Sequence, residues 1–397
     1  MDAPTLARLE RRGDFPSLAS GWHYLDSAAS ALKPQAVIDA ATRALGGDYA
    51  TVHRGVYAKS AEMTRAYEAA RRKVAGLVGG AEDEIVFTRG ATEAINLVAY
   101  SYGQVVGTGR RVLLSQLEHH SNIVPWQLAG WQVDVCPLTA NGRIDLDAAE
   151  AMLTRDHAMV AFAHVSNVLG SRLDVARAAD LAHRVGAKLL VDGCQAVPRL
   201  AVDVDALDCD FYAFSAHKLY GPTGIGALWG RPDLLAAMPP WQGGGAMIDR
   251  VTFEGTAFAA PPARFEAGTP AIVEGIAFGA AVDYVLSAGL DAIHAHEAAL
   301  VDELREALSR RNDVTVFGPA DSAGIVSFAM DGVHPHDLGT ILDENRVAIR
   351  AGHHCAQPLM DHLGVPATAR ASFGLYSAAD DIAALLDGID RTRRIFG

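Results

Sequence analysis

Seven short apolar or β-branched runs alternate with amphipathic segments between about residues 84 and 230, and this alternation constrains the fold more than any other feature of the chain. In chain order the runs are EIVFT, RVLLSQ, WQVDVCPL, MVAFAHV, KLLVDG, FYAFSAH and IGALWG. Segments between them, such as TEAINLVAYSYG and DVARAADLAHRVGA, repeat apolar residues at three- and four-residue steps, which is the helical period. The pattern predicts an α/β fold with a largely parallel sheet covered on both faces.

A smaller second region follows a Gly- and Pro-rich stretch that runs from about Pro239 to Pro270. Its GGGAM run at 243–247 predicts loops and a hairpin, and long loops of this kind often have a function. Later segments predict helices at 272–290, 295–311 and 380–396 and strands at 314–319 and 324–330. We therefore expect a large domain over 21–289 and a small α+β domain formed by 1–20 and 290–397.

Charge and cysteine content exclude several classes of protein. The chain has 34 Lys and Arg against 47 Asp and Glu, and this net charge of -13 opposes nonspecific binding to nucleic acid. The first residues lack the apolar run of a signal peptide, and no later stretch has eighteen uninterrupted apolar residues, so we expect a soluble, cytoplasmic protein without a membrane span. The four cysteines are far apart in the sequence: Cys136, Cys194, Cys209 and Cys355. This spacing favours neither a disulfide framework nor a zinc site, and it is compatible with a single reactive thiol.

Polar residues follow two of the predicted strands at the edge where α/β proteins bind ligands. Asp192 and Gln195 follow KLLV, and Ser215, His217 and Lys218 follow FYAF. Singly, such residues are usually solvated lysines, helix caps or turn residues. Together, a lysine and a carboxylate are what pyridoxal 5′-phosphate requires, one to form a Schiff base and the other to keep the ring nitrogen protonated.

Two further turns suit the same cofactor. The segment EIVFTRGATEAINLV predicts a strand, a glycine-containing turn and a helix in that order. The amides of Ala91 and Thr92 and the Thr92 hydroxyl would then lie at the start of the helix, where they can hold a phosphate. The next strand ends in Glu118, His119 and His120, where an imidazole can stack on a flat ring and move protons. Without the lysine and the aspartate, Thr92 would be an ordinary helix-start residue and the histidines surface loop residues.

The third informative segment is RAGHHCAQPLM at 350–360. Arg350, His353 and His354 give Cys355 an electropositive setting that favours the thiolate. The competing interpretation is a small buried apolar cysteine, which we assign to Cys136 and Cys209. Arg370 can clamp a substrate carboxylate with two hydrogen bonds, although a structural ion pair is the alternative.

A series of segments in the same order resembles the SufS/CsdA-like group II cysteine desulfurases, which are class V, fold-type I pyridoxal phosphate enzymes. The segments are YLDSAAS (24–30), VHRG (52–55), RGATEAINLV (89–98), EHHSNIVPW (118–126), HVSNVLG (164–170), DGCQAV (192–197), SAHKLYGPTGIG (215–226), RFEAGTP (264–270), RAGHHCAQPLM (350–360) and the stretch around Arg370. The resemblance implies a large domain with a mostly parallel seven-stranded sheet and a smaller α+β carboxyl-terminal domain.

The resemblance also implies a role for each candidate site residue. Lys218 would hold the cofactor as an internal aldimine, Asp192 would pair with the ring nitrogen, and His119 would stack on the ring. Gln195 and Asn167 would engage ring substituents or nearby substrate. The phosphate would be bound by Thr92, Ala91, Ser215 and His217, joined by Thr269 from the other subunit of a homodimer. Arg370 and Arg350 would bind the substrate, and the GGGAMI segment would reach across the dimer to the place where a sulfur acceptor docks.

The implied reaction converts L-cysteine to L-alanine. Lys218 would act as the base, His119 would manage protons, and Cys355 would receive the sulfur as a persulfide and pass it to a SufE-like acceptor for iron-sulfur cluster assembly. Two positions depart from many relatives, Tyr57 in place of a histidine and Cys194 in place of an alanine.

The sequence leaves two other interpretations open. One is another reaction on the same scaffold, such as selenocysteine lyase or a different class V lyase or aminotransferase. The other is a non-catalytic metal-binding or sulfur-relay protein built on His119, His120, His353, His354 and Cys355, although adjacent ligands of this kind do not easily converge on one ion. We therefore expect no metal site.

Overall fold

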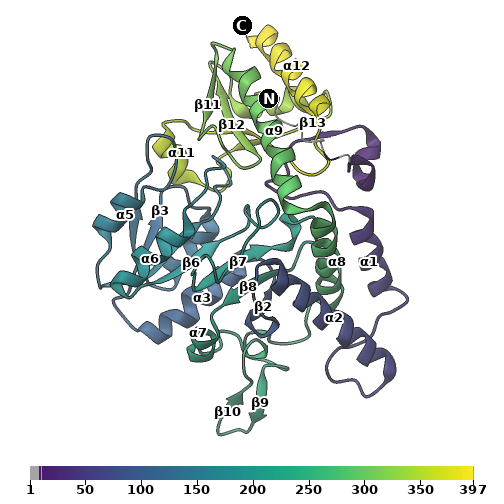
Figure 1. The fold of residues 1–397 in the computed structure, drawn as a ribbon, viewed down its shortest axis with the longest axis vertical. Coiled ribbons are helices and arrows are strands. Elements are labelled where there is room, and N and C mark those ends of the chain that lie inside the picture. The colour runs from purple at the N-terminus through teal and green to yellow at the C-terminus, as the bar shows by residue number, and fades with distance from the viewer. Residues whose placement is uncertain (1–8, 10, 397) are drawn as a thin grey trace, which may run out of the picture.

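The computed structural model describes residue 9 and residues 11–396 (Figure 1). Residues 1–8, 10 and 397 lie outside the described part. Much of the predicted small-domain segment 1–20, and of the amino-terminal segment that is expected to lack a signal peptide, therefore lies outside the described residues.

A seven-stranded sheet forms the centre of the fold, in the order β2-β8-β7-β6-β5-β3-β4. Its strands are β2 (Ile85–Thr88), β3 (Arg111–Ser115), β4 (Gln132–Cys136), β5 (His157–Ala163), β6 (Lys188–Asp192), β7 (Phe211–Ser215) and β8 (Gly226–Gly230). β8 runs antiparallel to both of its neighbours, and the other adjacent pairs are parallel. The predicted α/β class and the mostly parallel seven-stranded sheet are confirmed.

Helices cover both faces of this sheet. One face packs on α3 (Ala91–Val106), α4 (Val124–Leu128) and α7 (Pro232–Ala237), and the other on α2 (Ala58–Leu77), α5 (Leu146–Met152), α6 (Val175–Val185) and α8 (Ile272–Ala288). Because neighbouring side chains of a strand point to opposite faces, Val112 and Leu114 join one core and Leu113 joins the other. This double burial explains why most of the strands are continuous apolar runs; the edge strand β4, with one buried residue of five, is the exception.

A second sheet, antiparallel and four-stranded, has the order β11-β12-β15-β14. Its strands are β11 (Val314–Phe317), β12 (Ile325–Met330), β14 (Arg350–Gly352) and β15 (Thr368–Ser372), with α9 (Leu290–Ser309), α10 (Pro335–Asp343), α11 (Gln357–Leu363) and α12 (Ala379–Phe396) nearby in sequence. The chain also has α1 (Gln35–Leu45) and a short parallel pair of β1 (His23–Tyr24) and β13 (Val347–Ala348). The second sheet and α12 lie at one end of the molecule in Figure 1.

The chain bends by 73° between α8 and α9, where we expect the boundary of the two domains; the division itself stays a prediction. Among the described residues, no single helix is long and apolar enough to cross a membrane, and α8 and α9 satisfy the length and composition test only as a bent pair.

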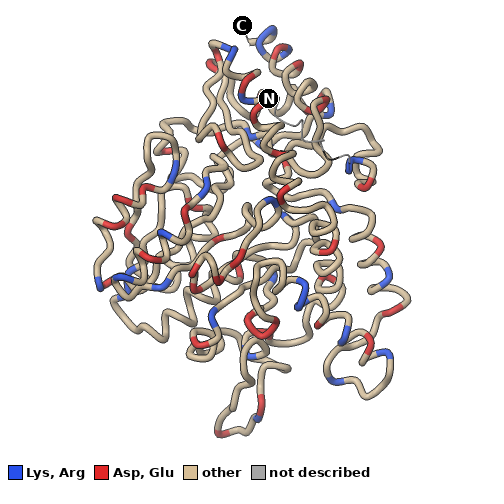
Figure 2. The backbone as a smooth tube through the Cα atoms, viewed as in Figure 1, with Lys and Arg blue, Asp and Glu red and all other residues tan. Residues whose placement is uncertain are grey.

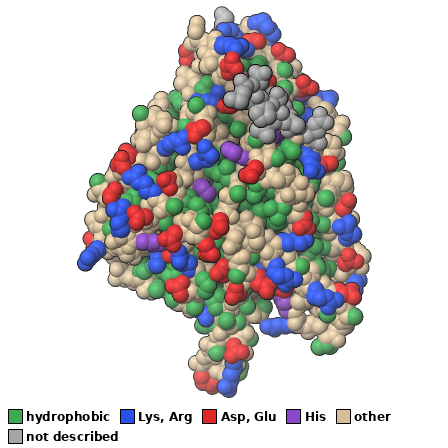
Figure 3. All heavy atoms as spheres, viewed as in Figure 1, with side chains coloured by type: hydrophobic (Ala, Val, Ile, Leu, Met, Phe, Trp, Pro, Cys, Tyr) green, Lys and Arg blue, Asp and Glu red, His purple; other side chains and the backbone are tan. Residues whose placement is uncertain are grey.

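The Gly- and Pro-rich stretch forms the predicted hairpin, from β9 (Ile248–Val251) and β10 (Thr256–Phe258). The hairpin projects from the end of the molecule opposite the second sheet (Figure 1). Charged side chains gather on it in Figure 3, and the Phe253 side chain at its turn is fully exposed. Elsewhere, basic and acidic positions are interspersed along the chain (Figure 2).

Candidate active site

One cavity of about 230 Å³ collects the candidate site residues. All but two of the residues proposed from the sequence line it: Ala91, Thr92, His119, Asn167, Asp192, Ser215, His217, Lys218, Arg350, Cys355 and Arg370. Most of them follow the carboxyl ends of sheet strands, and the last three come from β14, β15 and the loop before α11. The cavity therefore lies between the two sheets.

Asp192 and Lys218 reach this cavity from neighbouring parallel strands. Asp192 is the last residue of β6 and is buried, and one of its carboxylate oxygens accepts a hydrogen bond from the Cys194 amide at 3.0 Å. Lys218 ends the short 3-10 helix Ala216–Lys218 that directly follows β7. The side-by-side pairing of β6 and β7 thus brings an amine and a carboxylate together at one edge of the sheet.

The turn between β2 and α3 forms a second wall. Gly90 has a φ of 154°, and a Cβ added to Gly226 on β8 would lie 2.6 Å from the Gly90 Cα, so two chain segments meet here without side chains. The Ser215 Oγ accepts a hydrogen bond from the Ala91 amide at 2.9 Å, and the Thr92 and Ser121 hydroxyls are 2.7 Å apart. Hydroxyls at the start of a long helix suit a phosphate group.

His119 is held as a neutral imidazole. Its Nδ1 accepts a hydrogen bond from the Ser121 amide at 3.0 Å, which places the ring proton of the neutral form on Nε2. Burial, and next the positive charge of Lys218, lower the pKa of His119 to about 4. At neutral pH the His119 Nε2 therefore carries a proton and is available as a hydrogen-bond donor.

Glu118 beneath this loop was not identified as a site residue from the sequence. Its buried carboxylate accepts hydrogen bonds from the Ser115 Oγ at 2.6 Å, the Asn122 Nδ2 at 2.8 Å and the Ala163 amide at 3.1 Å. Burial raises the pKa of Glu118 to about 7. The Glu118 network fixes the segment that carries His119, and the only signal for it in the sequence is an acidic residue directly after an apolar strand.

Cys355 lies on a loop with unusual backbone geometry. The side chain is exposed, and His354 and Cys355 have φ of 52° and 56°, in the left-handed region. Three hydrogen bonds hold the loop: from the Asn167 Nδ2 to the His354 carbonyl at 2.8 Å, from the His120 amide to the Cys355 carbonyl at 2.7 Å, and from the Gln357 amide to the His120 Nε2 at 3.1 Å.

His354 does not provide the positive charge that we expected beside the thiol. Its imidazole is buried and bonded to Thr368, and burial, with Arg370 as the next cause, lowers the pKa of His354 to about 3. Of the electropositive neighbours expected from the sequence, Arg350 is the permanent cation on the cavity wall. No group of three or more potential metal ligands occurs in the part of the chain that the structure describes, so the histidines and Cys355 do not converge on one ion there.

The two candidate substrate-binding arginines differ in burial. Arg370 is only 2% exposed; its Nη1 donates to the Asn167 carbonyl at 2.7 Å and its Nη2 donates to the Asp26 carboxylate at 3.1 Å. Arg350 is 45% exposed and lies 3.8 Å from the other Asp26 oxygen. Asp26, within the YLDSAAS segment, was also not identified from the sequence.

Gln195 and Thr269 do not line the cavity. The buried Gln195 amide donates to the Ala28 carbonyl at 2.7 Å and accepts from Arg199 at 2.9 Å, so it lies behind the cavity wall that Ala28 forms. Thr269 lines a separate cavity of about 540 Å³. The place of Thr269 in the phosphate site of the other subunit, which the resemblance implies, stays a prediction.

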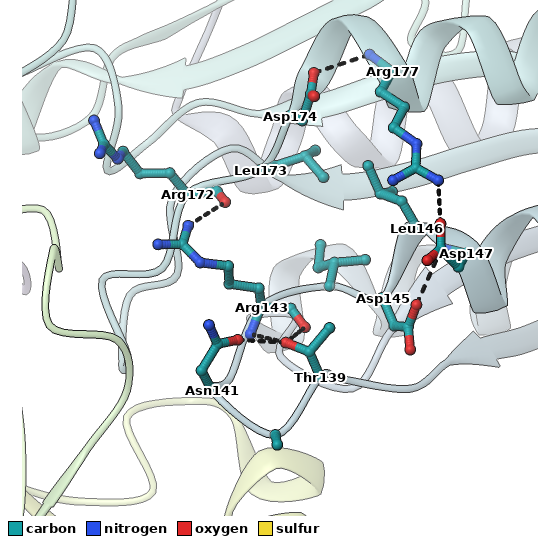
Figure 4. A pocket seen from close by; sticks show the side chains of 12 residues that line it. Thr139, Asn141, Arg143, Asp145, Leu146, Asp147, Arg172, Leu173, Asp174 and Arg177 are labelled. Atoms are coloured by element: carbon teal, nitrogen blue, oxygen red, sulfur yellow. Dashed lines mark hydrogen bonds and ion pairs between the residues drawn. The ribbon is translucent and has the colours of Figure 1, made fainter.

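A larger cavity, of about 770 Å³, lies elsewhere on the surface (Figure 4). Its arginines are engaged by neighbours, Arg177 by Asp147 and Arg143 by Asp321, and Asp145 and Asp174 cap α5 and α6. Its lining has no lysine, cysteine or histidine, so it offers neither a nucleophile nor a Schiff-base amine.

Residues 23–385 match the family model described as aminotransferase class-V. The chain belongs to this family. It is 48% identical over 398 residues to a cysteine desulfurase of Dickeya dadantii, covering 97% of each chain, and 48% identical to a probable cysteine desulfurase of Halobacterium salinarum, covering 97% of this chain and 96% of the relative. The membership expected from the sequence motifs is confirmed.

Solved structures agree with this family placement. The cysteine desulfurase CsdA from Escherichia coli superimposes with a TM-score of 0.92 at 40% identity, covering 97% of this chain and 98% of that one. The cysteine desulfurase from Thermococcus onnurineus also gives a TM-score of 0.92, at 36% identity, covering 98% of this chain and 99% of that one.

Proposed function

We propose that this protein is a pyridoxal phosphate-dependent cysteine desulfurase that converts L-cysteine to L-alanine and takes the sulfur onto Cys355. One observation carries the proposal: a single small cavity is lined by a lysine, a buried carboxylate, a buried arginine and an exposed cysteine. Other class V reactions need the first three, but a sulfur transfer also needs the thiol.

The chemistry of the cavity residues fits pyridoxal phosphate. In this proposal Lys218 would hold it, Asp192 would pair with its ring nitrogen and His119 would lie against its ring. The Ser215 hydroxyl, His217 and the start of α3 at Ala91 and Thr92 form the cradle for its phosphate. When bound, this cofactor supplies an electron sink for reactions at the substrate α-carbon.

Each protein group then has a task that its environment suits. Arg370, with Arg350, binds the substrate carboxylate, and the Lys218 amine removes the α-proton. His119, neutral and protonated at Nε2, donates a hydrogen bond to the reacting molecule. The Cys355 sulfur then bonds to the substrate sulfur while the substrate carbon–sulfur bond breaks. The electron pair of that bond stays with the carbon skeleton, which takes up a proton to give alanine, and Cys355 is left as a persulfide.

The finer parts of the proposal concern partners. We place the enzyme in the cytoplasm as a homodimer in which Thr269 of each subunit joins the phosphate site of the other. The projecting β9–β10 hairpin, with Phe253 fully exposed at its turn, supports contact with another molecule. We assign the persulfide sulfur to a SufE-like acceptor and to iron-sulfur cluster assembly.

The test is to incubate the pyridoxal phosphate-loaded protein with L-cysteine and to measure the mass of the peptide that contains Cys355. We expect one added sulfur atom on that peptide and one alanine formed per persulfide. Alanine formation with an unmodified Cys355 peptide would contradict the persulfide step, and absence of alanine would contradict the whole assignment.

A further inference from the structure

Arg350 and Arg370 lie directly opposite each other on the paired strands β14 and β15. Like charges at such positions repel, and Arg370 is also almost fully removed from water, which costs free energy unless an anion compensates it. The fold supplies one anion. Asp26 lies beside Ser372 of β15, and its two carboxylate oxygens are 3.1 Å from Arg370 and 3.8 Å from Arg350.

This arrangement leaves the two arginines only half neutralised. Two permanent cations face one carboxylate on the cavity wall, so the local charge has room for one more anion. The hydrogen bonds also leave Arg370 only partly satisfied. Its Nη1 donates to the Asn167 carbonyl and its Nη2 donates to Asp26, while its buried Nε has no acceptor among the described residues. This enclosed Nε, unpaired among the described residues, adds to the cost of burying Arg370 beside a single carboxylate.

We propose that Asp26 is a positioning residue that holds Arg370 and Arg350 in place for the substrate carboxylate and, through its own negative charge, limits how tightly that carboxylate binds. The proposal rests on the proposed function, in which the ligand is an α-amino acid. It has a specific consequence. Asp26 changes the binding affinity for molecules that have a carboxylate and does not change the affinity for molecules that have only the amine.

L-Alanine and ethylamine test this consequence because they differ only by the carboxylate. The loaded wild-type enzyme and the D26N variant are titrated with each compound, and binding is followed by the absorbance of the bound cofactor. We expect D26N to bind L-alanine about tenfold more tightly and ethylamine with unchanged affinity, and D26E to stay close to wild type. For L-cysteine we expect D26N to lower both KM and kcat, since binding is stronger but the arginines are less fixed. Unchanged or weaker L-alanine binding, or an equal change for ethylamine, would overturn the proposal.

A second measurement does not depend on the cofactor or on turnover. The Tm of each variant is compared in sodium acetate and in sodium chloride at equal ionic strength. Without its counter-ion, D26N should melt at a lower temperature than wild type, and acetate should raise its Tm more than it raises that of wild type. Equal effects of acetate on both proteins would contradict a role for Asp26 as the counter-ion. If the acetate effect is found but the wild-type enzyme forms no alanine from cysteine, the proposed function fails and the assignment of Asp26 stands.

Discussion

The four cysteines show how burial separates a reactive thiol from inert ones. Cys355 is exposed, whereas burial raises the pKa of each of the other three, Cys136, Cys194 and Cys209, to about 12. Cys194 lines the same cavity, but at neutral pH it is a protonated thiol. Exposure as well as position therefore favours Cys355 as the proposed nucleophile.

This difference predicts the outcome of two matched substitutions. C355A should lower alanine formation from L-cysteine by about 10³-fold, because no nucleophile remains to accept the sulfur. C194A should keep activity within about threefold of wild type, and both variants should keep the absorbance of the bound cofactor. The measurement is alanine released per cofactor. Equal loss in both variants would show that Cys194 shares the sulfur transfer.

The residues that line the cavity were largely predictable from the sequence, but the residues that hold them in position through hydrogen bonds were not. Asp192, Lys218 and Cys355 belong to recognisable local segments, so their order along the chain was sufficient to identify them. Asp26 and Glu118 act through contacts with residues distant in sequence, such as Arg370 and Ala163. Gln195 is expected at ring substituents or nearby substrate, and this role stays a prediction. Its buried amide is bonded to Ala28 and Arg199, contacts that its sequence segment did not indicate.

At the level of elements, the apolar runs predicted the seven strands of the main sheet. Six of these strands are buried along most of their length and therefore read as continuous apolar runs, whereas the edge strand β4 is mostly unburied. The antiparallel direction of β8 could not be predicted from such a run, since direction depends on the connection that precedes the strand. The short strands β1, β13 and β14 were also not predicted. They are too short to show a period, and β1 and β13 pair across more than three hundred residues.

The loop before α11 carries Cys355, the proposed nucleophile, and His120 makes two hydrogen bonds to this loop. The His120 amide donates to the Cys355 carbonyl, and its imidazole Nε2 accepts from the Gln357 amide. H120A removes the second hydrogen bond, so the left-handed backbone at His354 and Cys355 should relax.

We expect H120A to lower kcat for alanine formation about tenfold with little change in KM, because a small displacement of the thiol slows the transfer but not substrate binding. H353A is the matched control, since this exposed imidazole makes neither hydrogen bond. Steady-state kinetics of both variants, together with the rate of Cys355 alkylation, provide the measurement. A loss in H353A as large as that in H120A would exclude this role of His120.

At the scale of the whole molecule, the site exists only because two sheets meet. The large sheet contributes Asp192 and Lys218 from strand ends, and the second sheet contributes the arginines of β14 and β15. Bringing these groups together buries ionisable side chains that would titrate near neutral pH in the unfolded chain. Two buried imidazoles of this kind are His354, which lines the cavity, and His164, which is 2.9 Å from the Tyr212 hydroxyl.

This burial predicts an acid-sensitive fold. Burial lowers the pKa of His164 to about 4 and that of His354 to about 3, against an unfolded value of about 6.5, so below pH 6.5 the unfolded chain binds protons that the folded chain excludes. The contribution of these two neutral imidazoles to the free energy of unfolding is complete above pH 6.5 and is lost as the pH falls toward 4. Glu118, whose pKa burial raises to about 7, acts in the opposite direction over part of this range, so a single curve does not isolate the histidines.

The difference between wild type and H164Q does isolate one of them. Glutamine does not titrate, so between pH 7.5 and pH 5.5 wild type should lose about 1 kcal/mol more unfolding free energy than H164Q. Urea unfolding of both proteins at the two pH values, with and without bound pyridoxal phosphate, gives the comparison. Identical pH dependence in the two proteins would mean that His164 takes up its proton as readily in the folded state as in the unfolded chain, and its buried position beside Tyr212 would then have to admit a charge.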